Sequence, residues 1–198
     1  MRLPSENDGP STHGESASAL DRFRPYLRML ARLQLDDALQ AKLDESDIVQ
    51  QTLMEAHQSL ADFRGQSDAE KAAWLQKILV RNVADEMRKY RRGKRDVRLE
   101  ASIQVAMSES SARLERWLAS ESGTPSQRAI ANEQLVALAT ALMKLPEDQR
   151  RAVELHHLQG LPSAMVAKRL DRSEVAVAGL LRRGLKKLRE TMREDSVR

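Results

Sequence analysis

Residues 145–190 constrain the fold of this chain most, because apolar-periodic stretches follow one another there with only short turns between them. They read LPEDQRRAVELHHLQGLPSAMVAKRLDRSEVAVAGLLRRGLKKLRE. In the last part, apolar or small residues recur at helical spacing on one face, at Val177, Leu181, Gly184, Leu185 and Leu188. We therefore predict a short helix, a turn, a second short helix over 163–170, another turn and a long basic helix whose apolar face meets the core.

The opposite face of the long helix begins with small residues and continues with cations. It comprises Val175, Ala176, Gly179, Arg182, Arg183, Lys186 and Lys187. In the turn before it, Asp171 tolerates left-handed backbone angles and Ser173 can cap the helix. A basic face alone can simply be solvated. Together with the preceding helix and turn, it predicts a helix-turn-helix module whose outward face suits a DNA groove.

The composition favours helices throughout. Aromatic residues make up only 3% of the 198 residues, so the core must consist mainly of Leu, Ala, Val and Ile. Glycine and proline are few, and no stretch shows the alternating β-branched pattern of a strand. We predict an all-α protein with two helical domains joined by a flexible linker.

The cysteine count and the charge limit the classes of function. The chain has no cysteine, which excludes disulfides and thiolate metal sites and fits a reducing compartment. It shows no signal peptide or membrane-spanning pattern, so we expect a cytoplasmic protein. The net charge of +4 does not by itself indicate nucleic acid, and the distribution of the charges is more informative.

Composition and periodicity divide the chain into four parts. Residues 1–18 are polar and rich in Ser, Gly and Pro, which predicts a disordered tail. Residues 19–98 form the first helical domain. Residues 99–123 have weak periodicity and predict a linker that can hold short helical segments. Residues 124–198 form the second domain, which contains the helix-turn-helix.

Residues 46–63 predict a helix with two neighbouring stripes. Val49, Leu53, Ala56 and Leu60 form the apolar stripe. Beside it runs a second stripe that is polar and lacks Lys and Arg; we call Asp47, Gln50, Gln51, Met54 and Glu55 the polar stripe. This stripe is either a solvated face or a docking surface for a partner helix.

A long helix that becomes basic follows. Ser67 and Glu70 have the spacing of a capping box, which predicts that this helix begins within a residue or two of Ser67. Over residues 88–98 it carries seven basic side chains against only Asp96, with Tyr90 among them. Such a run can grip phosphates and stack a base. The alternative is a solubilising helix end that the helix dipole favours.

Three strings of this sequence resemble those of bacterial RNA polymerase sigma factors of the extracytoplasmic-function (ECF) type. DESDIVQQTLMEAHQSLADFRG resembles the family's segment 2.1 to 2.2, and WLQKILVRNVADEMRKYRRGKRD resembles its segment 2.3 to 2.4. Residues 142–189 resemble region 4. The strings occur in the family's order with a linker between them, and the resemblance covers roughly residues 20–98 and 127–191.

The resemblance implies a non-catalytic subunit that directs core RNA polymerase to specific promoters and assists DNA opening. The first domain would bind core polymerase and the minus-ten element, and the second the minus-thirty-five element. The implied partners are the β′ clamp helices and the β flap of core polymerase, promoter DNA and, where one exists, an anti-sigma factor. No cofactor, metal or membrane insertion is implied.

The resemblance also assigns residues. The polar stripe would contact core polymerase. In the first domain, the implied DNA contacts are Gln66, Ser67, Trp74, Lys77, Arg81, Asn82, Arg88, Arg91 and Arg92. In the second, they are Ser173, Val175, Ala176, Gly179, Arg182, Arg183 and Lys186. The chain departs from the family pattern in having Arg81 seven residues after the tryptophan, where asparagine is usual.

Other classes of function fit the sequence less well. An enzyme is not expected, because His156 and His157 are adjacent and no glycine-rich phosphate loop occurs. A helical adaptor that binds no nucleic acid would not need two basic clusters. The alternative that stays open is a stand-alone helix-turn-helix transcriptional regulator that uses its first domain to dimerise or sense. The basic cluster at residues 88–98 is unnecessary for such a regulator.

Overall fold

A computed structural model describes residues 19–35, 42–91, 97–122 and 131–196, and this part of the chain is helical with no strand. The elements in order are α2 (Arg24–Gln34), α4 (Glu45–Gln58), the 3₁₀ turn η1 (Leu60–Asp62), α5 (Asp68–Arg91), α6 (Val97–Ser122), α7 (Ala131–Met143), α8 (Glu147–Val153), the π-helical turn η3 (Glu154–Leu158), α9 (Ser163–Leu170) and α10 (Glu174–Ser196). The predicted all-α class is confirmed.

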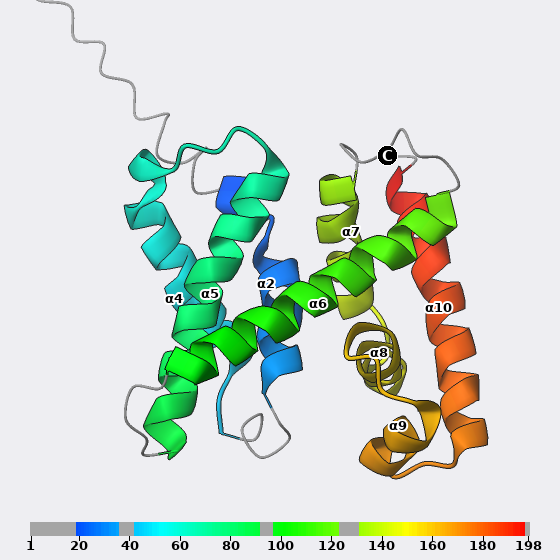
Figure 1. The fold of residues 1–198 in the computed structure, drawn as a ribbon. Coiled ribbons are helices and arrows are strands. Elements are labelled where there is room, and N and C mark those ends of the chain that lie inside the picture. Colours follow the sequence, from blue (N-terminus) through cyan, green and yellow to red (C-terminus); the bar gives the residue numbers. More distant parts are fainter. Residues whose placement is uncertain (1–18, 36–41, 92–96, 123–130, 197–198) are drawn as a thin grey trace, which may run out of the picture.

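Two groups of helices make up the molecule (Figure 1). In the N-terminal group, α2, α4 and α5 pack around apolar side chains such as Leu27, Val49 and Leu79, all fully buried. In the C-terminal group, α7 to α10 enclose Leu138 and Val166. Helix α2 lies between α5 and α7 and contacts both, so the two groups share a continuous apolar core.

Helix α6 corrects the expectation of a linker with short helical segments. Residues 97–122 form one continuous helix that crosses both groups and contacts α2, α5, α7 and η3 (Figure 1). Its inward positions are Ile103, Met107, Ser110, Ser111 and Leu114. The periodicity looked weak because two of these positions are serines. One serine has a buried partner, since the Ser111 and Tyr26 hydroxyls lie 2.9 Å apart.

The helix boundaries follow local capping. Ser67 and Glu70 form the predicted capping box, because the Glu70 amide donates to Ser67 Oγ (3.2 Å) and the Ser67 amide to Glu70 Oε2 (3.0 Å). The bonds from Gln66 and Ser67 lower the pKa of Glu70. Helix α4 begins one residue earlier than expected, because Asp44 accepts from the Ser46 amide (2.7 Å) and so caps it. It ends at Gln58 and continues as η1, earlier than the predicted end near residue 63.

Some expectations fall outside the described residues. These are the tail over residues 1–18, residues 92–96 of the basic run and the start of the second domain over residues 124–130.

Candidate nucleic-acid interface

The turn between α9 and α10 has the predicted helix-turn-helix geometry. Helix α9 spans Ser163–Leu170 and ends at Asp171, whose φ of 52° and ψ of 54° place it in the left-handed region. Ser173 Oγ then accepts a hydrogen bond from the Ala176 amide (3.2 Å), which caps α10. Both local roles inferred from the sequence are confirmed.

The apolar face of α10 holds the helix against the C-terminal group. Val177 and Leu188 are buried, and Leu181 nearly so. A Cβ atom on Gly184 would lie 3.2 Å from Val153 Cγ2, so this glycine lets α10 pack tightly where it crosses α8. This packing fixes which side of α10 faces solvent.

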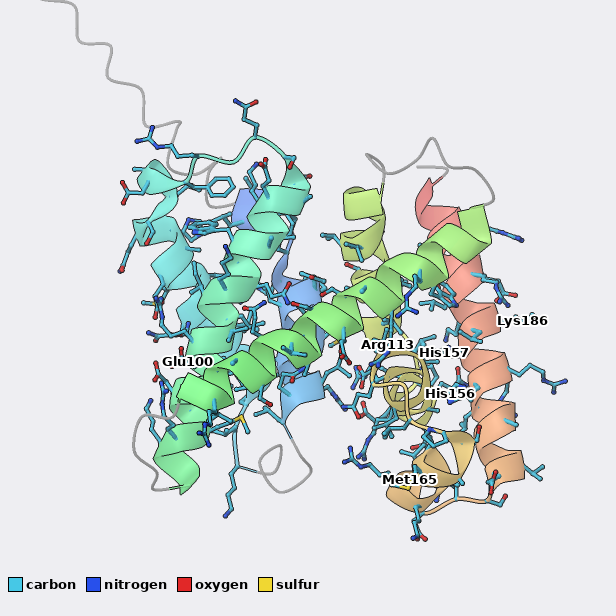
Figure 2. All side chains as sticks on the ribbon, viewed as in Figure 1. Glu100, Arg113, His156, His157, Met165 and Lys186 are labelled. Atoms are coloured by element: carbon cyan, nitrogen blue, oxygen red, sulfur yellow. The ribbon has the colours of Figure 1, made fainter. Side chains whose placement is uncertain are left out.

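The outward side of α10, which we call the reading face, is exposed. Val175 leaves 83% of its surface exposed, and Arg182, Arg183 and Lys186 also project into solvent (Lys186 is labelled in Figure 2). The Arg183 guanidinium lies over Gly179, 3.3 Å from the position a Cβ would take there. On α9, Met165 is a further exposed apolar side chain that the sequence argument did not single out (Figure 2).

Residues 135–188, from α7 to α10, match the family model described as sigma-70, region 4. The chain contains a sigma-70 region 4 domain. Over these residues the match confirms the resemblance to sigma factors, and the domain is typical of the ECF type. No curated protein matches the chain. The match supports a sigma factor or helix-turn-helix DNA-binding role, and α10 is the second helix of the helix-turn-helix within it.

The polar stripe lies on the exposed side of α4, outside region 4. Asp47, Gln50, Gln51 and Met54 are exposed and Glu55 is partly buried, so the helix brings all five predicted residues onto one surface. Arg24 donates to Gln50 Oε1 (3.0 Å), and Gln51 donates to Glu55 Oε1 (3.0 Å). Their contact with polymerase stays a prediction.

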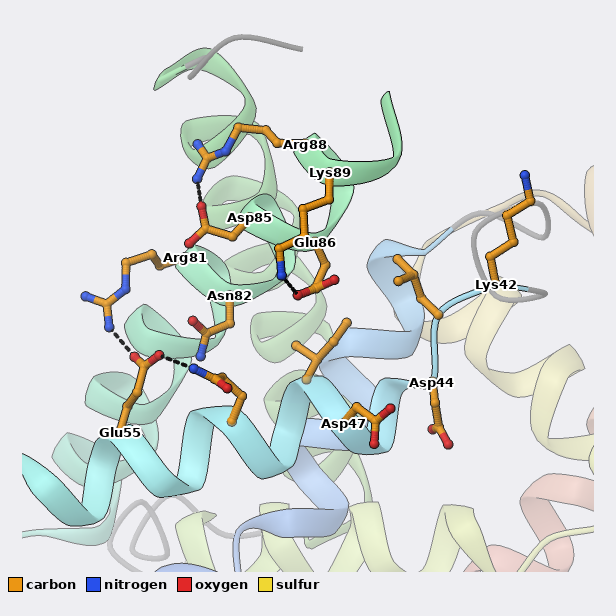
Figure 3. A pocket seen from close by; sticks show the side chains of 13 residues that line it. Lys42, Asp44, Asp47, Glu55, Arg81, Asn82, Asp85, Glu86, Arg88 and Lys89 are labelled. Atoms are coloured by element: carbon orange, nitrogen blue, oxygen red, sulfur yellow. Dashed lines mark hydrogen bonds and ion pairs between the residues drawn. The ribbon is translucent and has the colours of Figure 1, made fainter. Parts of the chain in front are cut away.

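A groove of about 940 Å³ separates the stripe from the C-terminal half of α5 (Figure 3). Across it, Arg81 of α5 forms an ion pair with Glu55. A residue predicted to touch DNA is thus paired with one predicted to touch polymerase. Sequence spacing could not show this pair, because its members belong to different helices.

Asn82 corrects one predicted DNA contact. Its side chain is only 6% exposed and donates to Thr52 Oγ1 (3.1 Å), which is itself fully buried on α4. The amide therefore ties α5 to α4 and cannot reach DNA in this structure. The position after Arg81 faces inward because successive helical residues differ by about 100°.

Arg88 is also engaged within the protein. Its guanidinium pairs with Asp85 and, at 2.8 Å, with Glu100 of α6. These bonds raise its pKa further, so the group stays charged. Arg91 ends α5, and Arg92 lies outside the described residues. The predicted basic contact surface is therefore partly neutralised by carboxylates.

The remaining predicted DNA residues of the N-terminal group lie near the start of α5. Gln66, Ser67 and Lys77 are exposed, while Trp74 is half-buried. The Phe63 ring covers Trp74 with ring centroids 4.8 Å apart. The sequence analysis did not single out Phe63. Gly65 is the signal that could have indicated it, because a Cβ atom at that position would lie only 2.3 Å from the Phe63 ring.

The described part of the chain has no candidate membrane span and no candidate metal cluster. None of its helices has the length and apolarity needed to cross a bilayer. It also contains no cluster of three or more His, Asp or Glu side chains suited to a metal ion.

Proposed function

We propose that the chain is a sigma factor that directs core RNA polymerase to specific promoters and assists DNA opening. The observation that carries the proposal is the exposed reading face of α10 within a sigma-70 region 4 domain. Small residues at the start of this face let the helix approach DNA closely, and cations further along it can bind phosphates.

In this proposal the reading face binds the minus-thirty-five element. Val175 and Ala176 contact thymine methyl groups, and Gly179 lets the backbone come near the groove. Ser173 caps the end that enters the groove, and Arg182, Arg183 and Lys186 grip phosphates or a single guanine.

In the same proposal, the N-terminal group binds core polymerase and the minus-ten element. The polar stripe docks on the β′ clamp helices, supported by an exposed surface that is polar except for Met54, which is 52% exposed. A partly buried apolar centre with a polar rim is typical of protein interfaces. The start of α5, with Gln66, Ser67, Trp74 and Lys77, faces the minus-ten DNA together with Arg81 once its carboxylate partner is engaged elsewhere. In this proposal Arg88, Arg91 and Arg92 bind the same DNA. Region 4 also contacts the β flap.

Transcription with purified components tests the proposal. The chain is mixed with core polymerase lacking any other sigma factor, and RNA synthesis is measured from a library of promoter sequences. We expect transcripts only when the chain is present, with selection at both promoter elements. Sequence-specific DNA binding by the chain alone, without any polymerase-dependent transcription, would instead show a stand-alone regulator.

A further inference from the structure

An open cleft lies between the end of α2 and the helices α6 and α9, beside the segment that joins η3 to α9. Its volume of about 310 Å³ is at the lower end of the range for small-molecule sites, which are concave and combine apolar walls with a few polar groups. Leu33, Leu35 and Leu161 supply the apolar lining. The polar lining includes a buried serine and two arginines from different helices. The sigma activity proposed above does not use this cleft.

The two arginines, Arg113 of α6 and Arg169 of α9, are held differently. Arg113 donates to the Leu158 carbonyl (3.0 Å) and to Glu109 Oε2 (3.2 Å; Arg113 is labelled in Figure 2). Gly160 leaves room for this side chain, because its φ is +73° and a Cβ there would lie 3.0 Å from the Arg113 guanidinium. Arg169 is exposed and forms no ion pair with any residue that the structure describes. One guanidinium is therefore fixed in place, and the other is available to an anion.

Ser110 of α6 is the least exposed polar residue of the cleft. Only 3% of its surface is exposed, and its hydroxyl makes no hydrogen bond within the described part of the chain. The neighbouring Ser111 differs, because its hydroxyl meets Tyr26 and donates to the Met107 carbonyl (3.0 Å). Buried polar groups nearly always have a partner, so an unpaired hydroxyl beside a cleft points to a ligand that supplies one. A small molecule can reach a group at this depth, whereas a DNA duplex is too wide to do so.

The charges around the cleft favour an anion. Glu109 is the one carboxylate among the described residues that line it, and 58% of the Glu109 side chain is exposed. An adjoining cavity of about 20 Å³ shares Arg169 with the cleft and adds Arg32 and Arg151 against the buried Glu154. Cations thus outnumber carboxylates over the cleft and the cavity together. Such an excess of positive charge raises the local concentration of small anions.

We propose that the cleft is a binding site for a small organic anion, a molecule that carries a carboxylate or phosphate group beside an apolar part. Its oxyanion lies between the guanidinium groups of Arg113 and Arg169, which bind such groups through charge-assisted hydrogen bonds. The Ser110 hydroxyl donates to an oxygen of the ligand, and the apolar part packs against Leu33 and Leu161. Such a site is independent of the sigma activity proposed above.

Thermal unfolding of the full chain tests the site, because a ligand that binds only the folded state raises the unfolding temperature. The probes are inorganic phosphate, phenyl phosphate, adenosine monophosphate, benzoate and citrate. Calorimetry then measures the dissociation constant of each probe that raises this temperature. We expect at least one organic probe to bind saturably and more tightly than inorganic phosphate, which lacks an apolar part. Phenyl phosphate and benzoate share a ring, so their comparison shows which oxyanion the site prefers.

Single substitutions place the ligand in the cleft. Arg169→Gln should weaken binding of the tightest probe at least ~tenfold, because it removes a charge-assisted hydrogen bond. Lys168→Gln is the matched control, since it makes the same charge change one residue earlier on the exposed side of α9, outside the cleft lining, and should bind like the parent. Ser110→Ala should weaken binding roughly three- to tenfold through the loss of one hydrogen bond. Glu109→Gln should instead strengthen it, because the carboxylate that competes for Arg113 is gone.

Four results would overturn the site, provided that circular dichroism shows the same helix content in all variants. One is the absence of saturable binding by any probe up to roughly 10 mM. Another is equal weakening by Arg169→Gln and Lys168→Gln, which would mean that α9 attracts anions in general. A third is unchanged binding in both Ser110→Ala and Glu109→Gln, which would place the probe elsewhere. A loss of DNA binding alone in Arg169→Gln would assign Arg169 to the nucleic-acid interface.

Discussion

The two predicted DNA-binding surfaces differ in how their cations are held. On α10, Arg182 and Arg183 project into solvent from a helix fixed by its apolar face. On α5, Arg81 is paired with Glu55, and Arg88 with Asp85 and Glu100. The cations of the α10 surface are therefore exposed in the free chain, while those of the α5 surface are partly neutralised. Two basic helices that look equivalent in sequence thus differ in whether their cations are exposed or already paired with carboxylates.

The largest effect that we predict is a pH dependence of stability, which a buried carboxylate causes and exposed carboxylates do not. Burial raises the pKa of Glu154 to about 7 from 4.5, which outweighs the attraction of Arg32 and Arg150. Glu147 and Arg151 of α8 act on it too, and Arg169 of α9 lines the same small cavity. The folded chain then binds a proton that the unfolded chain has released, so stability should fall as pH rises from about 4.5 to about 7 and level off above.

Glu154→Gln should remove most of this dependence, which amounts to about 3 kcal/mol. Denaturant unfolding at several pH values measures it. The exposed Glu190→Gln is the control and should keep the parent profile. A parent chain whose stability did not fall between these pH values would show that Glu154 remains charged in the fold.

A second prediction tests whether the polar stripe on α4 contacts core polymerase. Asp47→Lys combined with Glu55→Lys should weaken association with core polymerase by at least ~2 kcal/mol if the stripe is central to the interface. Asp62→Lys with Glu194→Lys makes an equal charge change at exposed positions outside the stripe and should bind normally. Co-elution with core polymerase measures both, and unchanged binding of the stripe variant would assign core contact to another surface.

On the reading face, alanine substitutions of single cations should distinguish base recognition from phosphate binding. Arg182→Ala should cost roughly 1 to 3 kcal/mol at one base position if it contacts a guanine. Arg183→Ala and Lys186→Ala should instead weaken binding to all sequences and reduce its salt dependence. Holoenzyme binding to single-base promoter variants at several salt concentrations distinguishes these results.

Gly179→Lys probes the same face and should disrupt promoter selection, because a long side chain would fill the approach to the groove. Intact selection in Gly179→Lys, or normal transcription by all three alanine variants, would show that another face of α10 meets DNA.

The smallest effect concerns the release of Arg81. Glu55→Gln removes its partner, and the freed cation should strengthen DNA binding by only about 0.2 to 1 kcal/mol, since exposed ion pairs contribute little. The salt dependence of DNA binding should also become steeper. Glu86→Gln, which removes the ion pair of Glu86 with Lys89 on the rim of the same groove, is the control. Equal effects from both variants would mean that net charge, and not Arg81, is responsible.

The sequence alone determined the features that depend on residues a few positions apart. It predicted the bounds of α9, the left-handed Asp171, the Ser173 cap and the capping box of Ser67 and Glu70. It also predicted which side of α10 is buried. Helical periodicity and capping act over three or four residues, so the chain shows them without any tertiary contact.

The tertiary structure decided what depends on partners far away in the chain. Arg32 meets Glu147 across 115 positions, and Asn82 turns inward because Thr52, 30 positions earlier, offers it a buried hydroxyl. Helix α6 owes its inward serines to the same cause, since Ser111 meets Tyr26 from across 85 positions. A polar residue looks alike in sequence whether it faces water or a buried partner. Only the packing of the helices decides which of these surroundings it receives.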